Sequence, residues 1–423
     1  MKVSVLKNHI ASGGLDNIFS DLYRDINVAR ERYIKACVGF AETFGEEREV
    51  MLFSAPGRTE VGGNHTDHQN GRVLAGSVDL DVIAVVAKND SNVIRVKSEG
   101  YDMDTVKFDM LSPRTCETAH SASLIRGMCA MAVRSGYNVG AFDAYTTSNV
   151  LKGSGLSSSA AFEVLIGVVI NHLFNDGKID AVTIAKYAQQ SEREFFGKPC
   201  GLMDQMASSV GGFTAIDFAD PQNPVIEKVD FDLAQNGHAL CIINTGGNHT
   251  DLTDDYADIT VECTKVSQFF GKRFLREVSE TDFFADIADL RKQVGDRAIL
   301  RAIHFFSDNK RALDEKQALS EGNFDKFLKL INESGDSSFK YLQNVYSISN
   351  VSEQGLSLAL ALTDKFLGGR GACRVHGGGF AGTVQAFVPL DMLDDYIAMI
   401  ESAFGKGNCH VLKIRPVGGT KIF

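Results

Sequence analysis

The sequence lacks the features that mark several classes of protein. It holds 43 lysines and arginines against 54 acidic residues, which gives a formal net charge of −11. That balance offers no surface for neutralising phosphates and argues against a nucleic-acid-binding protein. The longest apolar runs fall far short of the ~20 residues that a membrane-spanning helix needs. We therefore expect neither a nucleic-acid partner nor a membrane partner.

The arrangement of the cysteines and prolines indicates neither a zinc site nor a domain boundary. The eight cysteines include no CxxC pair, which argues against a zinc ribbon, and a chain of this length does not depend on disulfides. No basic stretch followed by an apolar core comes after Met1, so we expect no secretion signal and a cytoplasmic protein with reduced thiols. Seven prolines, no repeat and no low-complexity tract leave the domain boundaries weakly marked.

The composition and the order of elements are typical of a soluble globular protein. The 423 residues are 44% hydrophobic and 23% charged, enough for two domains of typical size. Helical spacing runs over 15–45, a short strand over 50–57, and helices and strands then alternate. Residues 275–365 are mostly helical in pattern, and strands return at 373–389 and 409–416. This order predicts an α+β fold with two layers per domain.

A glycine- and serine-rich stretch, "GSGLSSSAAFEVLIGVVI" (153–170), has the character of an anion site. Small residues let the backbone approach a ligand, and serine at a helix start leaves N–H groups free at the positive end of the helix dipole. Ser158 stands where a dinucleotide fingerprint needs glycine, and no Gly-Lys-Ser/Thr completes a P-loop. From the residues alone, an ordinary turn that caps a buried helix explains the stretch equally well.

A second stretch, "SAPGRTEVGGNHTDHQNG" (54–71), gathers an arginine, acids, an amide and histidines. It has too many polar side chains for a buried strand and too many glycines for a stable helix. We therefore expect a loop.

Together with three further segments, these stretches resemble motifs of the GHMP kinases, in the family's order. The family's second motif is matched by "GLSSSA" (155–160), and its glycine-rich third motif by "RVHGGGFAGTVQAF" (374–387). Residues 55–74 resemble the galactokinase signature within the family. "GKPCGLMDQMASSVGG" (197–212) resembles the galactokinase catalytic stretch, and "RAIHFFSDNKR" (301–311) a late helix of the same enzymes. The resemblance spans about residues 48 to 420.

The resemblance implies a fold and a reaction. The fold would be the two-domain GHMP architecture, with an N-terminal α+β domain (1–225), a ferredoxin-like C-terminal domain (226–423) and the active site in the cleft between them. The final strand could return to the first domain. The reaction would be ATP-dependent phosphorylation of a galactose-type sugar at its anomeric hydroxyl. Galacturonate, arabinose or N-acetylgalactosamine are alternative substrates, and a catalytically idle sugar and ATP sensor is the alternative of another class.

The resemblance also assigns roles to residues. Asp204 would accept or orient the proton of the sugar hydroxyl, and Arg58 would pair with it. Mg²⁺ would be held by Ser158 or Ser159 together with Glu192. The sugar would contact Glu60, Asn64, His65, Asp67, Gly201 and Tyr256. The ATP phosphates would contact Gly153, Ser154, Gly155, Leu156, Ser157, Ser158, Ser159, Ala160, Gly377, Gly378 and Gly379.

Each of these roles has a simpler alternative. Asp204 alone could be a helix-start acid and Arg58 a structural salt-bridge partner. Glu192 could be a solvated acid on a helix, Tyr256 a core residue, and the three glycines a plain β-turn.

Three residues depart from the galactokinase signature. Glu60 stands where the family has asparagine, Asn64 where it has glutamate, and His68 where it has tyrosine. One hypothesis is a compensated exchange that keeps one carboxylate and one amide in the site. The other hypothesis is a changed pocket around the exocyclic carbon of the sugar, where an uncharged Asn64 would tolerate a different group.

Overall fold

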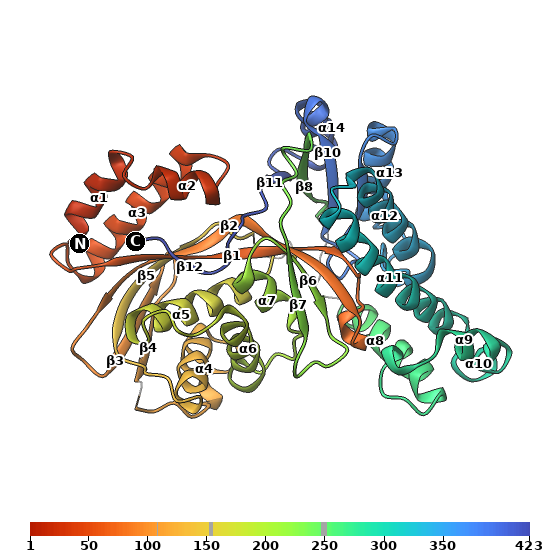
Figure 1. Ribbon diagram of the computed structural model, residues 1–423, viewed down its shortest axis with the longest axis horizontal. Coiled ribbons are helices and arrows are strands. Elements are labelled where there is room, and N and C mark those ends of the chain that lie inside the picture. Colours follow the sequence, from red (N-terminus) through yellow and green to blue (C-terminus); the bar gives the residue numbers. More distant parts are fainter. Residues whose placement is uncertain (108, 152–154, 247–251) are drawn as a thin grey trace.

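The computed structural model describes residues 1–107, 109–151, 155–246 and 252–423. Gly153 and Ser154 of the predicted phosphate loop lie outside these ranges. Two β-sheets form the framework, and helices cover both (Figure 1). None of the helices in the described ranges is long and apolar enough to cross a membrane.

The larger sheet has eight strands and carries the first half of the chain. Its order is β12-β1-β2-β5-β3-β4, with β6 paired to β2 and β7 paired to β6. Every neighbouring pair is antiparallel except β3 and β5. The strands are β1 (Met51–Gly62), β2 (Arg72–Lys88), β3 (Val93–Ser98), β4 (Met103–Lys107), β5 (Phe142–Ser148), β6 (Phe213–Asp217), β7 (Val225–Val229) and β12 (Thr420–Lys421).

Helices cover both faces of this sheet, so the first half has three layers rather than the predicted two. Successive residues of a strand point to opposite faces. Leu52 and Val85 pack in a core with the N-terminal helices, whereas Phe53 and Ala84 pack against the helices of the other face. Both faces of the larger sheet are apolar, so both must be packed against helices. The helices are α1 (Val3–Ala11), α2 (Asp16–Leu22) and α3 (Ile26–Phe44) on one face, and α4 (Ser121–Arg134), α5 (Ser158–Phe174), α6 (Ala181–Ser191) and α7 (Met203–Val210) on the other.

The helical pattern over 15–45 is divided into α2 and α3. The Asp25 side chain accepts hydrogen bonds from the backbone N–H groups of Asn27 and Val28. An aspartate in that position caps a new helix, so the chain turns between the two helices.

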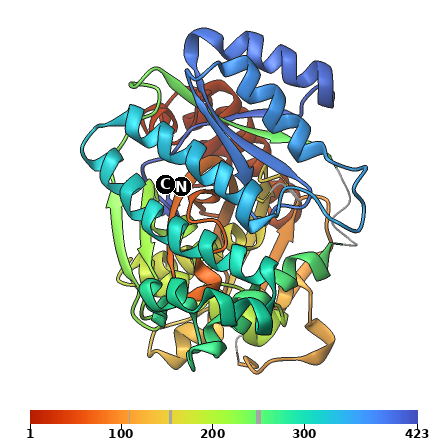
Figure 2. The same ribbon diagram turned by 90° about the vertical axis from the view of Figure 1, so that its right-hand side faces the viewer.

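The smaller sheet has four antiparallel strands in the order β11-β8-β10-β9. Because β8 leads through helices to the β9–β10 hairpin, and α14 then leads to β11, the connectivity is βαββαβ. Figure 2 shows helices against this sheet, and the ferredoxin-like assignment of 226–423 stays a prediction. The strands are β8 (His238–Asn244), β9 (Ala372–His376), β10 (Thr383–Pro389) and β11 (Cys409–Leu412).

Among the helices after β8, α12, α13 and α14 pack on this sheet, whereas α8, α9 and α10 pack with α11 and extend past the end of β1 and β2 (Figure 1). They are α8 (Thr253–Phe269), α9 (Glu280–Ala285), α10 (Ile287–Val294), α11 (Asp296–Ser320), α12 (Phe324–Ser337), α13 (Gly355–Leu367) and α14 (Leu393–Phe404).

The two halves of the chain are interlaced. β12 pairs with β1, with Thr420 opposite Ser54, so the end of the chain joins the first sheet. β7 also belongs to that sheet and begins at Val225, so the first unit extends a few residues beyond 225. The division at 225/226 stays a prediction.

Candidate active site

The polar stretch 54–71 is not the loop that its composition predicts. β1 runs through to Gly62, so Arg58 and Glu60 lie on a buried strand, and the turn begins only at Gly63. The strand tolerates these side chains because each has a partner of opposite charge. The Arg374 guanidinium donates to Glu60 Oε1 at 2.7 Å, and Arg58 pairs with Asp204. Pairing removes most of the cost of burying a charge.

Arg58 and Asp204 form the centre of the site. Arg58 Nε donates to Asp204 Oδ1 at 2.7 Å, and the same guanidinium donates to the backbone carbonyl of Gly155. The Ser157 hydroxyl donates to the other oxygen of Asp204. One buried strand, the loop before α5 and the first turn of α7 thus meet at one carboxyl group.

The electrostatics of this contact keep Asp204 ionised. Burial alone would raise the pKa of the Asp204 carboxyl, but the charge of Arg58 and the hydrogen bond from Ser157 outweigh burial and lower the pKa below its usual value. The side chain of Asp204 is 32% exposed and that of Arg58 is 10% exposed. Asp204 therefore presents a charged, accessible carboxylate, and Arg58 lies behind it.

The predicted phosphate motif leads into α5 beside this pair. Ser157 has a left-handed backbone conformation, with φ of 60°, and Ser158 and Ser159 form the first turn of α5. The first N–H groups of a helix have no partner within the helix, which suits them to anions. Within the described residues, Gly155 to Ala160 therefore carry the features of a phosphate site.

Glu192 is buried, so it is not a solvated helix acid. It lies in a short π-helical segment after α6 (Glu192–Phe196). Lys198 Nζ lies 3.0 Å from one of its oxygens, and Gln205 Nε2 donates to the other at 2.8 Å.

The residues predicted to hold magnesium have the donor chemistry that the ion prefers. Mg²⁺ prefers one or two carboxylates and keeps several water ligands. The hydroxyls of Ser158 and Ser159 and the Glu192 carboxylate are hard oxygen donors of this kind. The same Gln205 Nε2 lies 3.4 Å from Oε2 of Glu163 on α5, which is fully buried and whose Oε1 has no hydrogen-bond partner among the described residues. Glu163 was not predicted, although a lone acid in the apolar run "AAFEVLIGVVI" is the signal that could have revealed it.

The turn after β1 carries the predicted sugar residues. His65 has a left-handed backbone, with φ of 61°, and its Nε2 donates to the carbonyl of Gly378 at 2.9 Å. Burial and the nearby His68 lower the pKa of His65 to about 3, so the ring is neutral. Its Nδ1 is buried and has no partner among the described residues. A neutral ring that donates through Nε2 offers Nδ1 as an acceptor for a hydroxyl.

Asp67 and Tyr256 lie on either side of His68. A Cβ added to Gly201 would lie 2.8 Å from Asp67 Oδ2, so the missing side chain allows the carboxylate its position. The Tyr256 hydroxyl lies 3.2 Å from His68 Nε2, and the Tyr256 ring centroid lies 5.0 Å from that of His65. Tyr256 is 41% exposed, so it is not a core residue.

Glu60 and Asn64 contact each other directly. Asn64 Nδ2 donates to Glu60 Oε1 and to the carbonyl of Gly377, both at 2.8 Å. Asn64 Oδ1 accepts from Asn344 at 2.8 Å and from Ser338 at 3.3 Å. The amide is fully buried and its hydrogen-bonding capacity is used inside the protein. This geometry favours the compensated exchange over a sugar contact by Asn64.

The third glycine motif forms the turn between β9 and β10. Its carbonyls at Gly377 and Gly378 accept from Asn64 and His65, and a Cβ at Gly378 would lie 2.4 Å from the Tyr256 ring. Through these hydrogen bonds, the turn connects the sugar-signature segment to the second half of the chain. A contact of Gly377, Gly378 and Gly379 with nucleotide phosphates stays a prediction.

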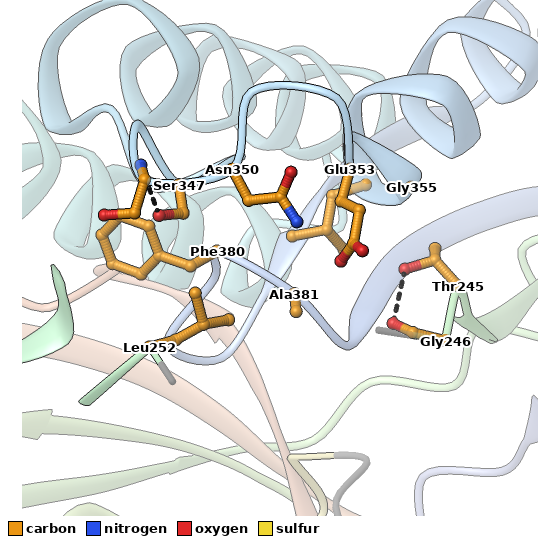
Figure 3. Close-up of a pocket in the computed structure, with 11 residues that line it drawn as sticks. Thr245, Gly246, Leu252, Ser347, Asn350, Glu353, Gly355, Phe380 and Ala381 are labelled. Atoms are coloured by element: carbon orange, nitrogen blue, oxygen red, sulfur yellow. Dashed lines mark hydrogen bonds between the residues drawn. The ribbon is translucent and has the colours of Figure 1, made fainter. Parts of the chain in front are cut away.

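A separate pocket of about 730 Å³ borders this turn (Figure 3). Phe380 and Ala381, directly after the glycines, line it together with Thr245, Glu353 and Asn350. None of the predicted site residues is among the residues that line it.

Comparisons with known proteins find two family models and several solved structures that resemble this chain. The model for the GHMP kinases N terminal domain matches residues 123–212, and the model for the galactokinase galactose-binding signature matches residues 39–88. The structure of galactokinase from Lactococcus lactis, complexed with galactose, is similar with a TM-score of 0.77 at 23% identity, covering 91% of this chain and 98% of that one.

More distant kinases share the fold. A D-glycero-D-manno-heptose 1-phosphate kinase from Bacteroides thetaiotaomicron has a TM-score of 0.59 at 15% identity, covering 88% of this chain and 98% of its own. Methanococcus jannaschii mevalonate kinase has a TM-score of 0.62 at 13% identity, covering 86% and 98%.

The chain is therefore similar to the GHMP kinases in its N-terminal domain and in its two-part fold. It also carries the galactokinase galactose-binding signature, and the two model matches support a sugar kinase.

Proposed function

We propose that this kinase transfers the γ-phosphoryl group of ATP to the anomeric hydroxyl of galactose or a closely related neutral sugar, giving the sugar 1-phosphate and ADP. The observation that carries the proposal is the contact of Asp204 with Arg58 and Ser157, between the start of α5 and the sugar-signature turn. The phosphate donor and the sugar would meet at this carboxylate.

The residues supply what phosphoryl transfer needs. The reaction requires alignment of two substrates, an oriented nucleophile and stabilisation of the charge that develops on the transferred group. Asp204, kept ionised by Arg58, would accept or orient the proton of the sugar hydroxyl. The Arg58 guanidinium would add positive charge beside the transferred group.

Magnesium would complete the nucleotide site. When bound, Mg²⁺ would neutralise charge on the phosphate oxygens. Ser158 or Ser159 and Glu192 would hold it, and the N–H groups at the start of α5 would bind phosphate oxygens.

The electrostatics of the sugar side favour a neutral sugar. Burial and the carboxylates of Asp67, Glu60 and Asp204 raise the pKa of Tyr256, which places three acids around one side chain. Acceptors such as Asp67 and His65 Nδ1 suit the hydroxyl groups of a hexose. A galacturonate carboxylate would be repelled there. Among neutral sugars, galactose is the first candidate, ahead of arabinose and N-acetylgalactosamine, because the matched signature is that of galactose binding.

The cytoplasm is the proposed compartment. All eight cysteines are free thiols, which suits a reducing environment where ATP is also available.

A coupled ADP-release assay across a sugar panel tests the proposal. The panel holds galactose, arabinose, N-acetylgalactosamine, galacturonate and glucose, and ³¹P NMR identifies the phosphorylated position. We expect the highest kcat/KM with galactose, a 1-phosphate product and the weakest galacto-configured activity with galacturonate. ATP and sugar binding without turnover on any sugar would instead identify a sensor and refute the kinase proposal.

A further inference from the structure

We propose that Glu163 is a positioning residue for the metal–nucleotide complex: together with Gln205, it accepts hydrogen bonds from the water shell of Mg²⁺ and orients Glu192. The inference rests on the proposed use of MgATP and adds a residue to that site.

The first observation is a pair of acceptors that have no donor. Glu163 and Gln205 are both fully buried. Glu163 Oε1 and Gln205 Oε1 have no hydrogen-bond partner among the described residues. A buried acceptor without a donor costs free energy, so two of them in one cluster call for a ligand that brings hydrogens.

The second observation ties this cluster to Glu192. The single Gln205 Nε2 donates to Glu192 Oε2 at 2.8 Å and lies 3.4 Å from Glu163 Oε2. Gln205 therefore bridges the two carboxylates. It directly follows Asp204 in α7, so the bridge is anchored beside the proposed catalytic carboxylate.

The third observation is the position of Glu163 on α5. It lies four residues after Ser159, on the same face of the helix, and helical side chains lean toward the N-terminus. The Glu163 carboxyl therefore reaches back toward the first turn, where Ser158 and Ser159 lie. Glu163 connects the serine side of the predicted metal site with the Glu192 side.

The chemistry of Mg²⁺ supplies the missing donors. The ion keeps several of its water ligands in protein sites, and each of these waters donates strongly polarised hydrogens. Residues that hold such outer contacts usually matter 10- to 100-fold for metal affinity.

The chain offers a matched control. Glu315 on α11 is also fully buried, and neither of its carboxylate oxygens has a partner among the described residues. It faces Gly62 at the far end of β1 and belongs to neither the serine turn nor the Glu192 cluster. E315Q therefore measures what neutralising a buried acid costs without touching the proposed metal site.

The experiment measures nucleotide affinity by calorimetry, without sugar. ADP is titrated into the full-length wild type, E163Q, E315Q and E192Q, in EDTA and again in excess Mg²⁺. The ratio of the two dissociation constants reports the coupling between metal and nucleotide. Because no phosphoryl transfer is needed, the result is independent of which sugar is phosphorylated, or whether any is.

We expect E163Q to lower the ratio by about 10-fold or more while the affinity for metal-free ADP stays within about 2-fold. E192Q should lower the ratio at least as far, and E315Q should leave it unchanged. An unchanged ratio in E163Q would overturn the proposal, as would an equal fall in E315Q. If E163Q does not fold, E163D replaces it: the shorter carboxylate should lower the ratio, and an unchanged ratio would again overturn the proposal.

Discussion

The chemistry of the site is concentrated in the contact between Arg58 and Asp204, two residues 146 positions apart in the chain. Each controls the other: Asp204 compensates the buried guanidinium, and Arg58 keeps the carboxylate charged. Ser157 binds the remaining oxygen and connects the pair to the phosphate loop. Two predictions follow from this contact.

Asp204→Asn should remove the proton acceptor while keeping the shape of the side chain. We expect kcat to fall by about 10²- to 10⁴-fold, which is the usual contribution of a general base. The affinity for ATP should remain close to that of the wild type, since Asp204 lies on the sugar side of the transfer. Steady-state kinetics and calorimetry measure the two effects, and a near-normal kcat would mean that another group is the base.

Arg58→Met should change the pH dependence as well as the rate. In the wild type, Arg58 helps to hold the Asp204 pKa below its usual value, so Asp204 stays ionised on the acid side of neutrality. Without the guanidinium, burial dominates and the folded pKa rises, so protonation begins at higher pH. The acid limb of kcat/KM should move to higher pH, and kcat should fall by about 10²- to 10³-fold.

Arg58→Lys is the control for this shift, because it keeps a positive charge. Its acid limb should lie closer to that of the wild type than that of Arg58→Met. Identical acid limbs in wild type and Arg58→Met would show that Arg58 does not set the ionisation of Asp204.

Family motifs predict roles for Asp204, Arg58 and Glu192, and the structure brings Arg58 and Asp204 together. The catalytic and metal-binding roles stay predictions. Arg374 was not predicted, because its partner Glu60 lies far away in the sequence, whereas Glu163, a lone acid in an apolar run, does have a local signal. Arg374 is fully buried and donates to Glu60, a contact that no local pattern reveals.

At the scale of elements, the junction of β1 with the following turn decides how the sugar residues are held. β1 extends into the polar stretch because Arg374 and Gln385 from the smaller sheet bind its side chains and backbone. Composition predicted a loop because it cannot show such partners. The exchanged residues Glu60 and Asn64 lie at this junction and bind each other.

The exchange can be tested by a double-mutant cycle in urea. Glu60→Asn alone leaves Arg374 without its carboxylate, and breaking a buried ion pair costs ~3–5 kcal/mol. Asn64→Glu alone places a second acid beside Glu60. If the two are a compensated pair, the double exchange should recover at least ~1 kcal/mol relative to the sum of the single changes.

Additive losses of stability would contradict the compensated exchange. The same variants also distinguish the second hypothesis. If Asn64 contacts the exocyclic group of the sugar, Asn64→Glu should reorder the sugars in the ADP-release panel. We expect the order to remain and all rates to fall together, because Asn64 is buried with its partners inside the protein.

At the scale of the whole molecule, the site exists because two sheets meet. The larger sheet supplies Arg58 and the strand that leads to His65, and the turn of the smaller sheet supplies the carbonyls that fix Asn64 and His65. The α+β class and most elements were predictable from periodicity and from the family resemblance. The return of the final strand to the first domain was also suggested by the resemblance. The third layer was not predictable, because it depends on which faces of the strands are apolar and packed against helices.

The most direct test of the account is a crystal structure of the protein with galactose and a non-hydrolysable ATP analogue. We predict density for the sugar beside His65 and Asp67, with its anomeric hydroxyl within hydrogen-bonding distance of Asp204 and facing the terminal phosphate of the nucleotide. A sugar bound elsewhere, or one that presents a different hydroxyl to Asp204, would contradict the account.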